Sequence, residues 1–318
     1  MIDIVAECSG AKTIGICGHI KPDGDCIGAT LALSLYLKKR LPDAEITVFS
    51  DEIAPCFDCV EGIKQFNYAF DKEQPEVFII VDTVDNRIGN GEKYFKNAKK
   101  TINIDHHISN ADGCAMVNYV VPTASSASEL IYDLMDKAYM DKEIAEAIYL
   151  GIAHDTGIFK YSNTAPKTLR IVAELIEYGF DYPTLLDVTY YEKTYLQNLV
   201  LARILLESKL HMDGKVISGF INMKTMAEMG VTGKDFDGVI NQLRITQGVD
   251  CAIFMYQINA VTYKVSLRSK KIVDVSKVAE YFGGGGHVRA AGFYYKGEPE
   301  EILAQILKLV EEDFQRGQ

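Results

Sequence analysis

The sequence has little positive charge and no long apolar run. Its formal net charge is −11 at pH 7, so we expect no broad basic face on which a long nucleic acid could lie. The apolar runs all fall short of the roughly 20 residues that a membrane span needs. An anionic substrate would therefore depend on local positive charge, which metal ions or a few arginines could supply.

A secretion signal and a complete zinc motif are also missing. No basic segment followed by an apolar core opens the chain. Most of the seven cysteines lie inside apolar segments, as reduced cytosolic thiols do. Cys56 and Cys59 have CxxC spacing, but neither a second pair nor a nearby histidine completes a metal site. We therefore assign this pair a structural or incidental role and expect a cytoplasmic protein without a membrane segment.

The composition is that of an ordinary globular protein, with 48% apolar and 24% charged residues. A chain of 318 residues is long enough for two domains with separate cores. There is no internal repeat, and the pattern of elements changes after a long predicted helix. We expect a first domain at residues 1–190, a connector helix at 191–210 and a smaller second domain at 211–318.

The first half of the chain alternates strand-like and helix-like segments. This alternation predicts an α/β fold: a mostly parallel sheet with helices on both faces. The second half predicts a smaller α+β domain. The predicted strands are 13–17, 46–50, 77–81, 101–104, 216–221, 251–258, 263–267 and 290–295, and the predicted helices are 29–39, 126–137, 141–153, 167–178, 192–209, 273–281 and 300–314.

Polar side chains fill the turn after the first predicted strand. His19, Asp23 and Asp25 lie there between two glycines, Gly18 and Gly28. Ligands of open α/β sheets bind at this carboxyl edge. Two close carboxylates repel each other unless a cation or a proton lies between them. Taken alone, the turn is better explained by a helix cap, but the rest of the chain repeats the pattern.

Three further acidic segments follow apolar elements. Asp82 and the run Asp105-His106-His107 end two predicted strands, and Asp155 follows an apolar helix. A single aspartate of this kind is most often a turn former, but gathered carboxylates without counterions would destabilise the fold by roughly several kcal/mol each. Carboxylate and imidazole ligands suit Mn²⁺ or a similar ion. This many ligands could hold two ions about 4 Å apart, an arrangement that performs in-line displacement at phosphorus.

A run of four glycines, Gly283–Gly286, joins a predicted helix to a predicted strand in the second half. Walker and Rossmann loops run from a strand into a helix, so this is neither. Consecutive glycines let the backbone approach a ligand and expose N–H groups that can bind an anion. Arg289 would add a bidentate phosphate donor and His287 a second polar group. Arg268, at the end of another strand, could join the same surface or be solvated.

Together these motifs resemble the DHH phosphoesterases with a DHH-associated carboxyl-terminal domain. The turn from His19 to Gly28, Asp82, Asp105-His106-His107 and Asp155-Thr156-Gly157 look like the four motifs of the catalytic domain. The glycine run with His287 and Ala290-Ala291-Gly292 looks like the signature of the second domain. The resemblance covers nearly the whole chain in the right order, and the size makes it most similar to the nano-RNase/pAp phosphatase branch.

This resemblance implies two Mn²⁺ ions, with Mg²⁺ or Co²⁺ as substitutes. His19, Asp23 and Asp82 would hold one ion, and Asp25, Asp82, His106 and Asp155 the other. His107, Asp105 and Asp82 would be the catalytic residues: Asp105 would orient a neighbouring histidine, and His107 would contact the scissile phosphate or assist the leaving group. The second domain would grip the far end of the substrate through Gly284, Gly285, Gly286, His287 and Arg289, with Arg268 and Arg87 as further candidates.

Two positions allow more than one interpretation. Arg87 could equally be a structural partner of the acidic edge. His154 stands before Asp155 where the family pattern has a small or hydroxyl residue, so it could be an extra ligand or a proton carrier. The segment Pro122–Ser126 looks like the family's serine-rich helix start, which would either cap the helix at 126–137 or contact phosphate, and we expect the cap.

The expected activity is hydrolysis of very short RNAs to 5′-mononucleotides and removal of the 3′-phosphate of pAp. The alternative is hydrolysis of cyclic dinucleotides or their linear products, such as c-di-AMP and pApA, which the metal motifs do not distinguish. An exonuclease for long strands is disfavoured because no basic track is evident. A non-catalytic nucleotide-binding protein is disfavoured because every expected acidic ligand is present. A surface helix of the first domain could support a homodimer.

Overall fold

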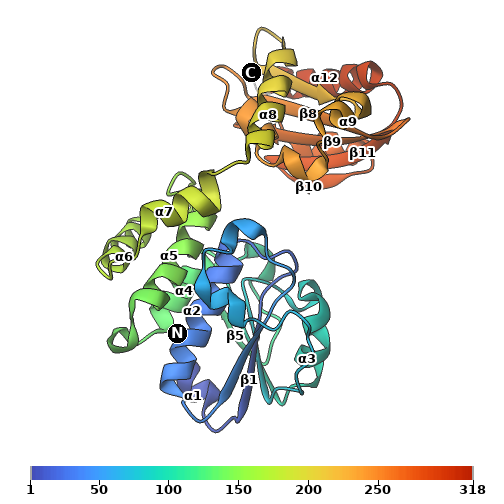
Figure 1. Cartoon of the computed structure of the whole chain (residues 1–318). Helices are drawn as coiled ribbons and strands as arrows, with labels where there is room; N and C mark the ends of the chain where they lie inside the picture. The colour runs from blue at the N-terminus through green and yellow to red at the C-terminus, as the bar shows by residue number, and fades with distance from the viewer. Residues whose placement is uncertain (1, 317–318) are drawn as a thin grey trace. The chain divides into compact units, whose positions relative to one another are not determined.

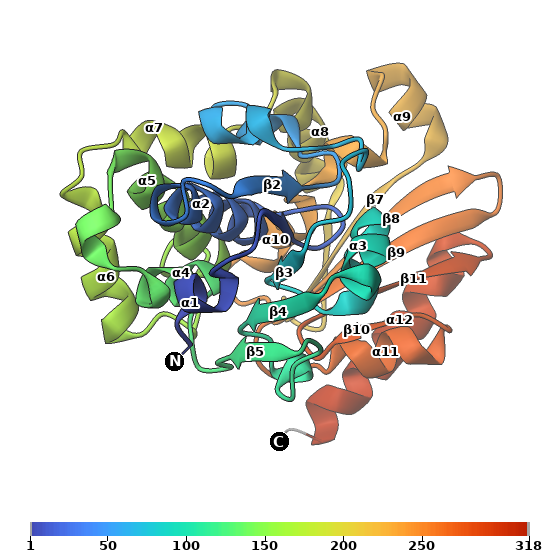
Figure 2. The same ribbon diagram turned by 90° about the horizontal axis from the view of Figure 1, so that it is seen from below.

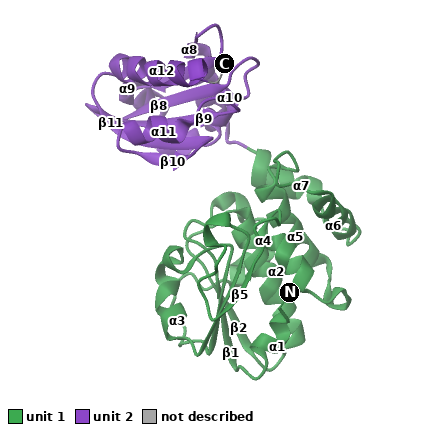
Figure 3. Cartoon of the chain, turned by 180° about the vertical axis from the view of Figure 1, so that it is seen from behind, with its two compact units in different colours: residues 1–192 green, residues 193–318 purple. Residues whose placement is uncertain are grey.

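The computed structural model describes residues 2–316, which form two compact units divided between Glu192 and Lys193 (Figure 3). The helix predicted as a connector is α8 (Tyr195–Glu207). Its buried residues Val200 and Ile204 pack in a hydrophobic cluster of the second unit, with residues such as Ile217 and Leu243. Each unit therefore has a core of its own.

The first unit contains a five-stranded sheet in which every neighbouring pair is parallel, in the order β2-β1-β3-β4-β5. The predicted parallel sheet is thus confirmed. The order changes direction at β1, which lies between β2 and β3, and ligands of such sheets bind outside the carboxyl ends of the strands at this point. The strands are β1 (Thr13–Cys17), β2 (Glu45–Phe49), β3 (Val77–Val81), β4 (Lys100–Asp105) and β5 (Val117–Val120).

Helices cover both faces of this sheet, as predicted (Figure 2). Alternate residues of β3 serve the two faces: Ile79 packs with α2, α4 and α5, whereas Phe78 packs with Tyr94 and Phe95 of α3. The helices are α1 (Ile4–Cys8), α2 (Gly24–Arg40), α3 (Glu92–Asn97), α4 (Ala127–Leu134), α5 (Lys142–Asp155), α6 (Pro166–Ile176) and α7 (Tyr182–Leu186).

Helices α2 and α5 approach each other at backbone distance. A Cβ atom on Gly28 of α2 would lie 2.3 Å from the carbonyl oxygen of Ala147 in α5. A Cβ atom on Gly151 of α5 would lie 2.6 Å from the Asp25 carboxylate. Only glycine permits this contact, which brings the first turn of α2 against the last turns of α5.

The second unit contains a six-stranded sheet in the order β10-β11-β9-β8-β7-β6 (Figure 1). The pair β7/β8 is parallel and the other pairs are antiparallel, which agrees with the predicted α+β domain. The strands are β6 (Lys209–His211), β7 (Val216–Ile221), β8 (Cys251–Asn259), β9 (Thr262–Ser269), β10 (Gly285–His287) and β11 (Ala290–Lys296).

Helices also cover both faces of the second sheet. Residues of α11 and α12 pack in one hydrophobic cluster, and residues of α8 and α10 pack in the other. The helices that follow α8 are α9 (Met223–Met229), α10 (Val239–Arg244), α11 (Val275–Tyr281) and α12 (Pro299–Arg316). Within residues 2–316, none of the helices has both the length and the apolar character needed to span a membrane.

Short helical turns complete both units. One of them, η7 (Asp187–Tyr191), is a π-helix that ends just before the boundary between the units. Such single-turn π-segments are rare and often occur at functional sites. The others are 3₁₀ turns: η1 (Pro55–Phe57), η2 (Glu61–Gln65), η3 (Asp85–Arg87), η4 (Gly89–Gly91), η5 (Ile108–Asn110), η6 (Lys137–Tyr139) and η8 (Gly233–Phe236).

Candidate metal centre

The turn between β1 and α2 holds the first group of polar side chains. Asp23 is the N-cap of α2, and its Oδ1 accepts hydrogen bonds from the backbone N–H groups of Asp25 and Cys26, both at 3.1 Å. His19 Nδ1 lies 2.9 Å from the Ile20 carbonyl oxygen and donates to it. The other ring nitrogen, Nε2, lies 3.7 Å from Asp23 Oδ1 and 3.6 Å from Asp82 Oδ2, and it carries a lone pair for a metal ion when the ring is neutral. This is the usual arrangement of a metal-binding histidine.

Asp25 is fixed by the start of another helix. Its side chain is only 2% exposed, and it accepts hydrogen bonds from the backbone N–H groups of Ala127 (2.7 Å) and Ser128 (2.9 Å), the first two residues of α4. The positive end of the helix dipole favours a carboxylate at this position. As predicted, a serine caps α4: Ser126 Oγ accepts from the backbone N–H of Glu129.

Asp82 lies at the centre of the group and immediately follows β3. Its backbone has a positive φ of 60°, which is uncommon for a residue other than glycine and is a form of strain that often accompanies function. The side chain is buried, and its Oδ1 atom has no hydrogen-bond partner. His106 Nε2 and His107 Nδ1 lie 3.4 Å and 3.6 Å from this oxygen, and a bound cation would also compensate its buried charge.

Asp105, at the end of β4, is fully buried and accepts hydrogen bonds from its neighbours. Its Oδ1 accepts from His107 Nδ1 at 2.7 Å and from the backbone N–H groups of His106 and His107, and its Oδ2 accepts from Asn110 Nδ2 at 2.7 Å. Burial opposes ionisation, but the hydrogen bonds from His107 and Asn110 outweigh it and lower the pKa of Asp105. Asp105 therefore stays charged and fixes the ring of His107.

Asp155 reaches the same place from the last residue of α5. Its Oδ2 lies 3.7 Å from His106 Nε2, and His106 Nε2 also lies 3.4 Å from Asp82 Oδ1 and 3.9 Å from Asp25 Oδ2. Asn163 Nδ2 donates to the Asp155 carboxylate at 3.3 Å and to the Ser125 carbonyl oxygen at 2.8 Å. Our sequence reasoning missed Asn110 and Asn163, which hold Asp105 and Asp155 in place.

The crowded carboxylates affect one another's protonation. Burial, then the charges of Asp82 and Asp155, raise the pKa of Asp25 well above its ordinary value. Burial and the charge of Asp82, opposed by His106, raise the pKa of Asp155 to about 6. Burial alone would lower the pKa of His106, but Asp82, Asp25 and Asp155 outweigh it and raise the value to about 10. Without a bound cation, protonation of some of these side chains would have to balance the negative charge of the carboxylates.

The residues fit a centre for two divalent cations. Three groups of side chains each offer ligand atoms within 4.8 Å of one another, and Asp82 belongs to two of these groups. Oxygen and imidazole nitrogen donors suit Mn²⁺ and similar ions. The structure therefore brings all six predicted ligands together. The groups are His19, Asp23 and Asp82; Asp25, His106 and Asp155; and Asp82, His106 and His107.

His154 belongs to none of these three groups. Its ring lies beside Phe57 and Tyr190, with ring centroids 5.3 Å away in each case. Burial lowers the pKa of His154 to about 4, so the ring is neutral near pH 7. The ring is half-buried and lies outside the three groups, so its place beside the candidate ligands needs an explanation other than direct coordination.

The other predicted substrate residues belong to none of the three groups. Arg87 is exposed in η3, and its carbonyl oxygen accepts from Ile20 N at 2.8 Å, which ties the loop after β3 to the loop after β1. The glycine run was predicted as a loop, but Gly285–His287 form the strand β10, paired with β11. A Cβ atom on Gly286 would lie 2.4 Å from the Ala290 carbonyl oxygen, so glycine is required for this pairing.

Two arginines of the second unit have structural partners. Arg289 Nη1 donates to the Val273 carbonyl oxygen at 2.9 Å and to Ser269 Oγ at 3.3 Å, and Arg268 Nη1 donates to the Leu267 carbonyl oxygen at 3.0 Å. The remaining donors of Arg289 leave room for a ligand, because a guanidinium carries five N–H groups. Of the predicted substrate residues, His287, Gly285 and Gly286 are the exposed members of β10.

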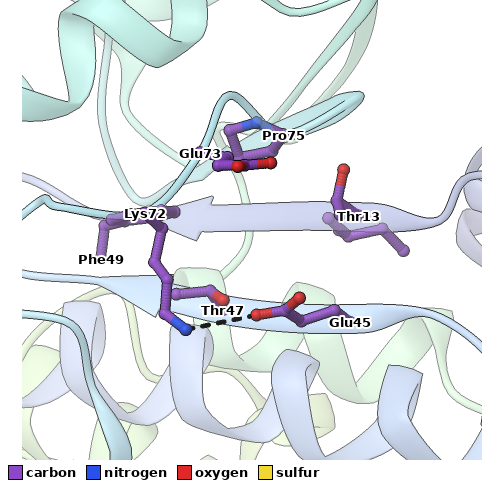
Figure 4. A pocket seen from close by; sticks show the side chains of 8 residues that line it. Thr13, Glu45, Thr47, Phe49, Lys72, Glu73 and Pro75 are labelled. Carbon is purple, nitrogen blue, oxygen red and sulfur yellow. Dashed lines mark hydrogen bonds and ion pairs between the residues drawn. The ribbon is translucent and has the colours of Figure 1, made fainter.

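A surface pocket of the first unit involves none of these residues. It lies along β1 and β2 and is lined by Thr13, Thr47 and Pro75, among others (Figure 4). Lys72 and Glu45 form an ion pair of 3.4 Å in it. It contains no residue of the three potential metal groups.

Comparisons with known proteins agree with this geometry. The model of the DHH family, N-terminal domain, matches residues 13–152, and the model of the DHHA1 domain matches residues 213–316. The chain is 29% identical to a probable bifunctional oligoribonuclease and PAP phosphatase of Streptococcus mutans, over 96% of this chain and 98% of the relative. It is 28% identical to the bifunctional oligoribonuclease and PAP phosphatase of Bacillus subtilis, over 98% of each chain.

Solved structures share the fold. An exopolyphosphatase-related protein from Bacteroides fragilis has a TM-score of 0.85 at 24% identity, covering 97% of this chain and 94% of that chain. RecJ from Thermus thermophilus, solved in complex with Mn²⁺, has a TM-score of 0.54 at 13% identity, covering 98% of this chain and 54% of that chain. At these identities the likeness concerns the fold alone.

Proposed function

The chain belongs to the DHH family of phosphoesterases, and from that premise we propose that it hydrolyses very short oligoribonucleotides to 5′-mononucleotides and removes the 3′-phosphate of pAp. The observation that carries the proposal is the convergence of six candidate metal ligands, among them Asp82, whose buried Oδ1 has no hydrogen-bond partner. The full-length relatives named for these two activities support the choice of substrate.

We propose that His19, Asp23 and Asp82 hold one cation, and that Asp25, Asp82, His106 and Asp155 hold the other. Mn²⁺ suits this donor set, and Mg²⁺ or Co²⁺ are the expected substitutes. The cations would supply Lewis acidity toward the phosphoryl oxygens and lower the pKa of water at the site.

The protein's own groups would orient the substrate and handle protons. Asp105 accepts the hydrogen bond of His107 Nδ1, so Nε2 is the ring nitrogen left for the substrate. The His107 side chain is 43% exposed, so a phosphate could reach it. The hydrogen bond with Asp105 raises the pKa of His107, which favours a ring that donates a proton to the scissile phosphate or the leaving oxygen.

The second unit would bind another part of the substrate. We propose that Gly284, Gly285, Gly286 and His287 supply main-chain and imidazole contacts, with Arg289, Arg268 and Arg87 as further candidates for phosphate contacts. The exposure of β10 and the uncommitted donors of Arg289 support this assignment. We also propose action in the cytosol, where the cysteines would stay reduced. A homodimer stays a prediction that analytical ultracentrifugation would test.

The test is product analysis with a small panel of nucleotides. A labelled RNA dinucleotide, pAp, pApA, c-di-AMP and a 30-nucleotide RNA are incubated with the protein and Mn²⁺, with Mg²⁺, or with EDTA. We expect EDTA-sensitive turnover of the dinucleotide and of pAp, and little turnover of the long RNA. Faster turnover of c-di-AMP than of pAp would favour the alternative activity, and no turnover of either pAp or the RNA dinucleotide would refute the proposal.

A further inference from the structure

His154 connects three separate segments of the first unit. It lies in the last turn of α5, beside Asp155. Its ring packs against Phe57 in η1 and Tyr190 in η7, and its Nε2 lies 3.0 Å from Thr189 Oγ1. A single side chain thus connects the end of α5 to two turns that are distant in the sequence.

The direction of the hydrogen bond with Thr189 follows from its other partner. Thr189 Oγ1 donates its only proton to the Leu185 carbonyl oxygen at 2.7 Å. The hydroxyl oxygen must therefore accept from His154, which places the ring proton on Nε2. This hydrogen bond holds the His154 ring, which cannot rotate without losing Thr189. It also anchors the π-helix η7 to α5.

The opposite side of the ring lies against the metal-binding turn. A Cβ atom on Gly24 would lie 2.2 Å from His154 Cγ and 2.6 Å from Nδ1, so the ring rests directly on the Gly24 backbone. Gly24 separates Asp23 from Asp25, which belong to different potential metal groups. Whatever sets the position of the Gly24 backbone also sets the spacing of these two carboxylates.

We propose that His154 is a positioning residue for the metal centre: anchored by Thr189, its ring holds Gly24 and thereby keeps Asp23 and Asp25 in register for two cations. The role rests on the metal centre of the proposed function. It requires no contact between His154 and metal or substrate, in agreement with its place outside the three groups. A smaller residue at position 154 would leave space beneath Gly24 and release η7.

The first experiment measures Mn²⁺ binding without substrate, by titration calorimetry and by the electron paramagnetic resonance of free Mn²⁺. For His154→Ala we expect binding about 10-fold weaker or more, as for other residues that orient metal ligands. His154→Phe keeps the ring but loses the bond to Thr189, and Thr189→Val removes the acceptor, so both should weaken binding less. Restoration by His154→Gln, which keeps an N–H donor, would support the role of this bond.

His211 offers a matched control. Its Nε2 lies 2.8 Å from Ser218 Oγ in the second unit, a bond of the same kind remote in sequence from the ligands. His211→Ala should leave Mn²⁺ binding unchanged. If His154→Ala fails to fold, Mn²⁺ binding by His154→Phe and Thr189→Val tests the inference instead. If these folded variants lose thermal stability but bind Mn²⁺ like the unchanged protein, His154 has only a structural role and the inference is wrong.

A double substitution tests the contact itself. Gly24→Ala should weaken Mn²⁺ binding strongly while the His154 ring is present, because the new methyl group would overlap it. His154→Gly removes both the ring and the Cβ atom, which would lie 2.6 Å from the methyl group, so Gly24→Ala should cost less in this variant than in the unchanged protein. Simple additivity would contradict the inference. Because these measurements need no nucleotide, they decide the role of His154 even where the unchanged protein cleaves none of the panel and the proposed function fails.

Discussion

The two units differ in whether their candidate functional residues are buried or exposed. The first unit buries the carboxylates of Asp25, Asp82 and Asp105, and Asp82 lies against both His19 and His106. The second unit exposes its candidate binding residues on a glycine-rich edge strand, and Arg289 has a structural partner in Val273. The side chains of the candidate metal centre are held in place by their neighbours before a ligand binds. The exposed residues of β10 would be held by the ligand itself. We therefore expect substitutions in the first unit to affect the chemical step and those in the second to affect binding.

The largest effect should follow Asp82→Asn. The amide keeps the shape but loses the charge shared by two potential metal groups, so we expect kcat/KM to fall more than the roughly 100-fold seen for residues behind the ligands. Asp71→Asn, an exposed aspartate outside the cluster, is the control and should retain activity. Steady-state kinetics on pAp measures both. An equal rate for Asp82→Asn and the unchanged protein would remove the metal assignment.

Asn110→Ala should come next. Asn110 donates to Asp105 and to Asn103, so its loss would free the carboxylate that fixes His107. We expect kcat to fall about 10- to 100-fold with KM nearly constant, since the binding surface is untouched. Asn118→Ala is a matched control, because the Asn118 amide makes both of its hydrogen bonds described in residues 2–316 with the nearby Ala115 backbone. Equal kinetics for the two variants would show that Asp105 needs no such support.

A smaller effect of a different kind should follow His287→Ala in the second unit. If the exposed edge contributes binding alone, KM should rise about 10-fold, equivalent to about 1.4 kcal/mol, with kcat preserved. His211→Ala, the other histidine of this unit, should change neither constant. A fall in kcat instead would mean that the second unit takes part in the chemical step, and the contrast between the units would fail.

The smallest effect should appear in the stability of the metal-free protein. The folded-state pKa of Asp155, about 6, lies above its ordinary value of 3.8. The stability it contributes is therefore fully present below pH 3.8 and is lost as the pH rises through about 6. Calorimetry with a chelator should show the first unit melting at a lower temperature at pH 7 than at pH 5.

Added Mn²⁺ should reverse this trend. A cation that binds only the folded state stabilises by about 2.7 kcal/mol at 100 times its Kd. No potential metal group occurs in residues 193–316, so the transition of the second unit should stay where it is. Greater stability of the chelated first unit at pH 7 than at pH 5 would contradict the electrostatic description of the cluster.

The sequence was most informative where a strand is buried on both faces. The bounds of β1, β3 and β7 match the predicted segments, because continuous apolar runs leave few alternatives. Asp82 and His106 could be singled out as candidate ligands for the same reason, since each follows such a strand. The fold class and the family followed from these segments together.

Other features gave no such signal. Strand β5 is a partly exposed edge strand containing Asn118, so it shows no apolar run. Strand β10 consists largely of glycine, whose composition indicates a loop, and only its pairing with β11 makes it a strand. Asn110 and Asn163 are single amides in loops, and their partners are brought close only by the tertiary fold. The contact of His154 with Gly24 depends on how α5 meets the turn before α2, which no local pattern encodes.

The glycine contact between α2 and α5 has a consequence for motion. With no side chains between the two backbones at Gly28 and Gly151, no change of rotamer can let the helices slide apart. Asp25 and Asp155 each lie within about one turn of that contact, so they inherit its rigidity. Amide hydrogens along this seam should exchange with deuterium only when the whole unit opens, long after those of the surrounding loops.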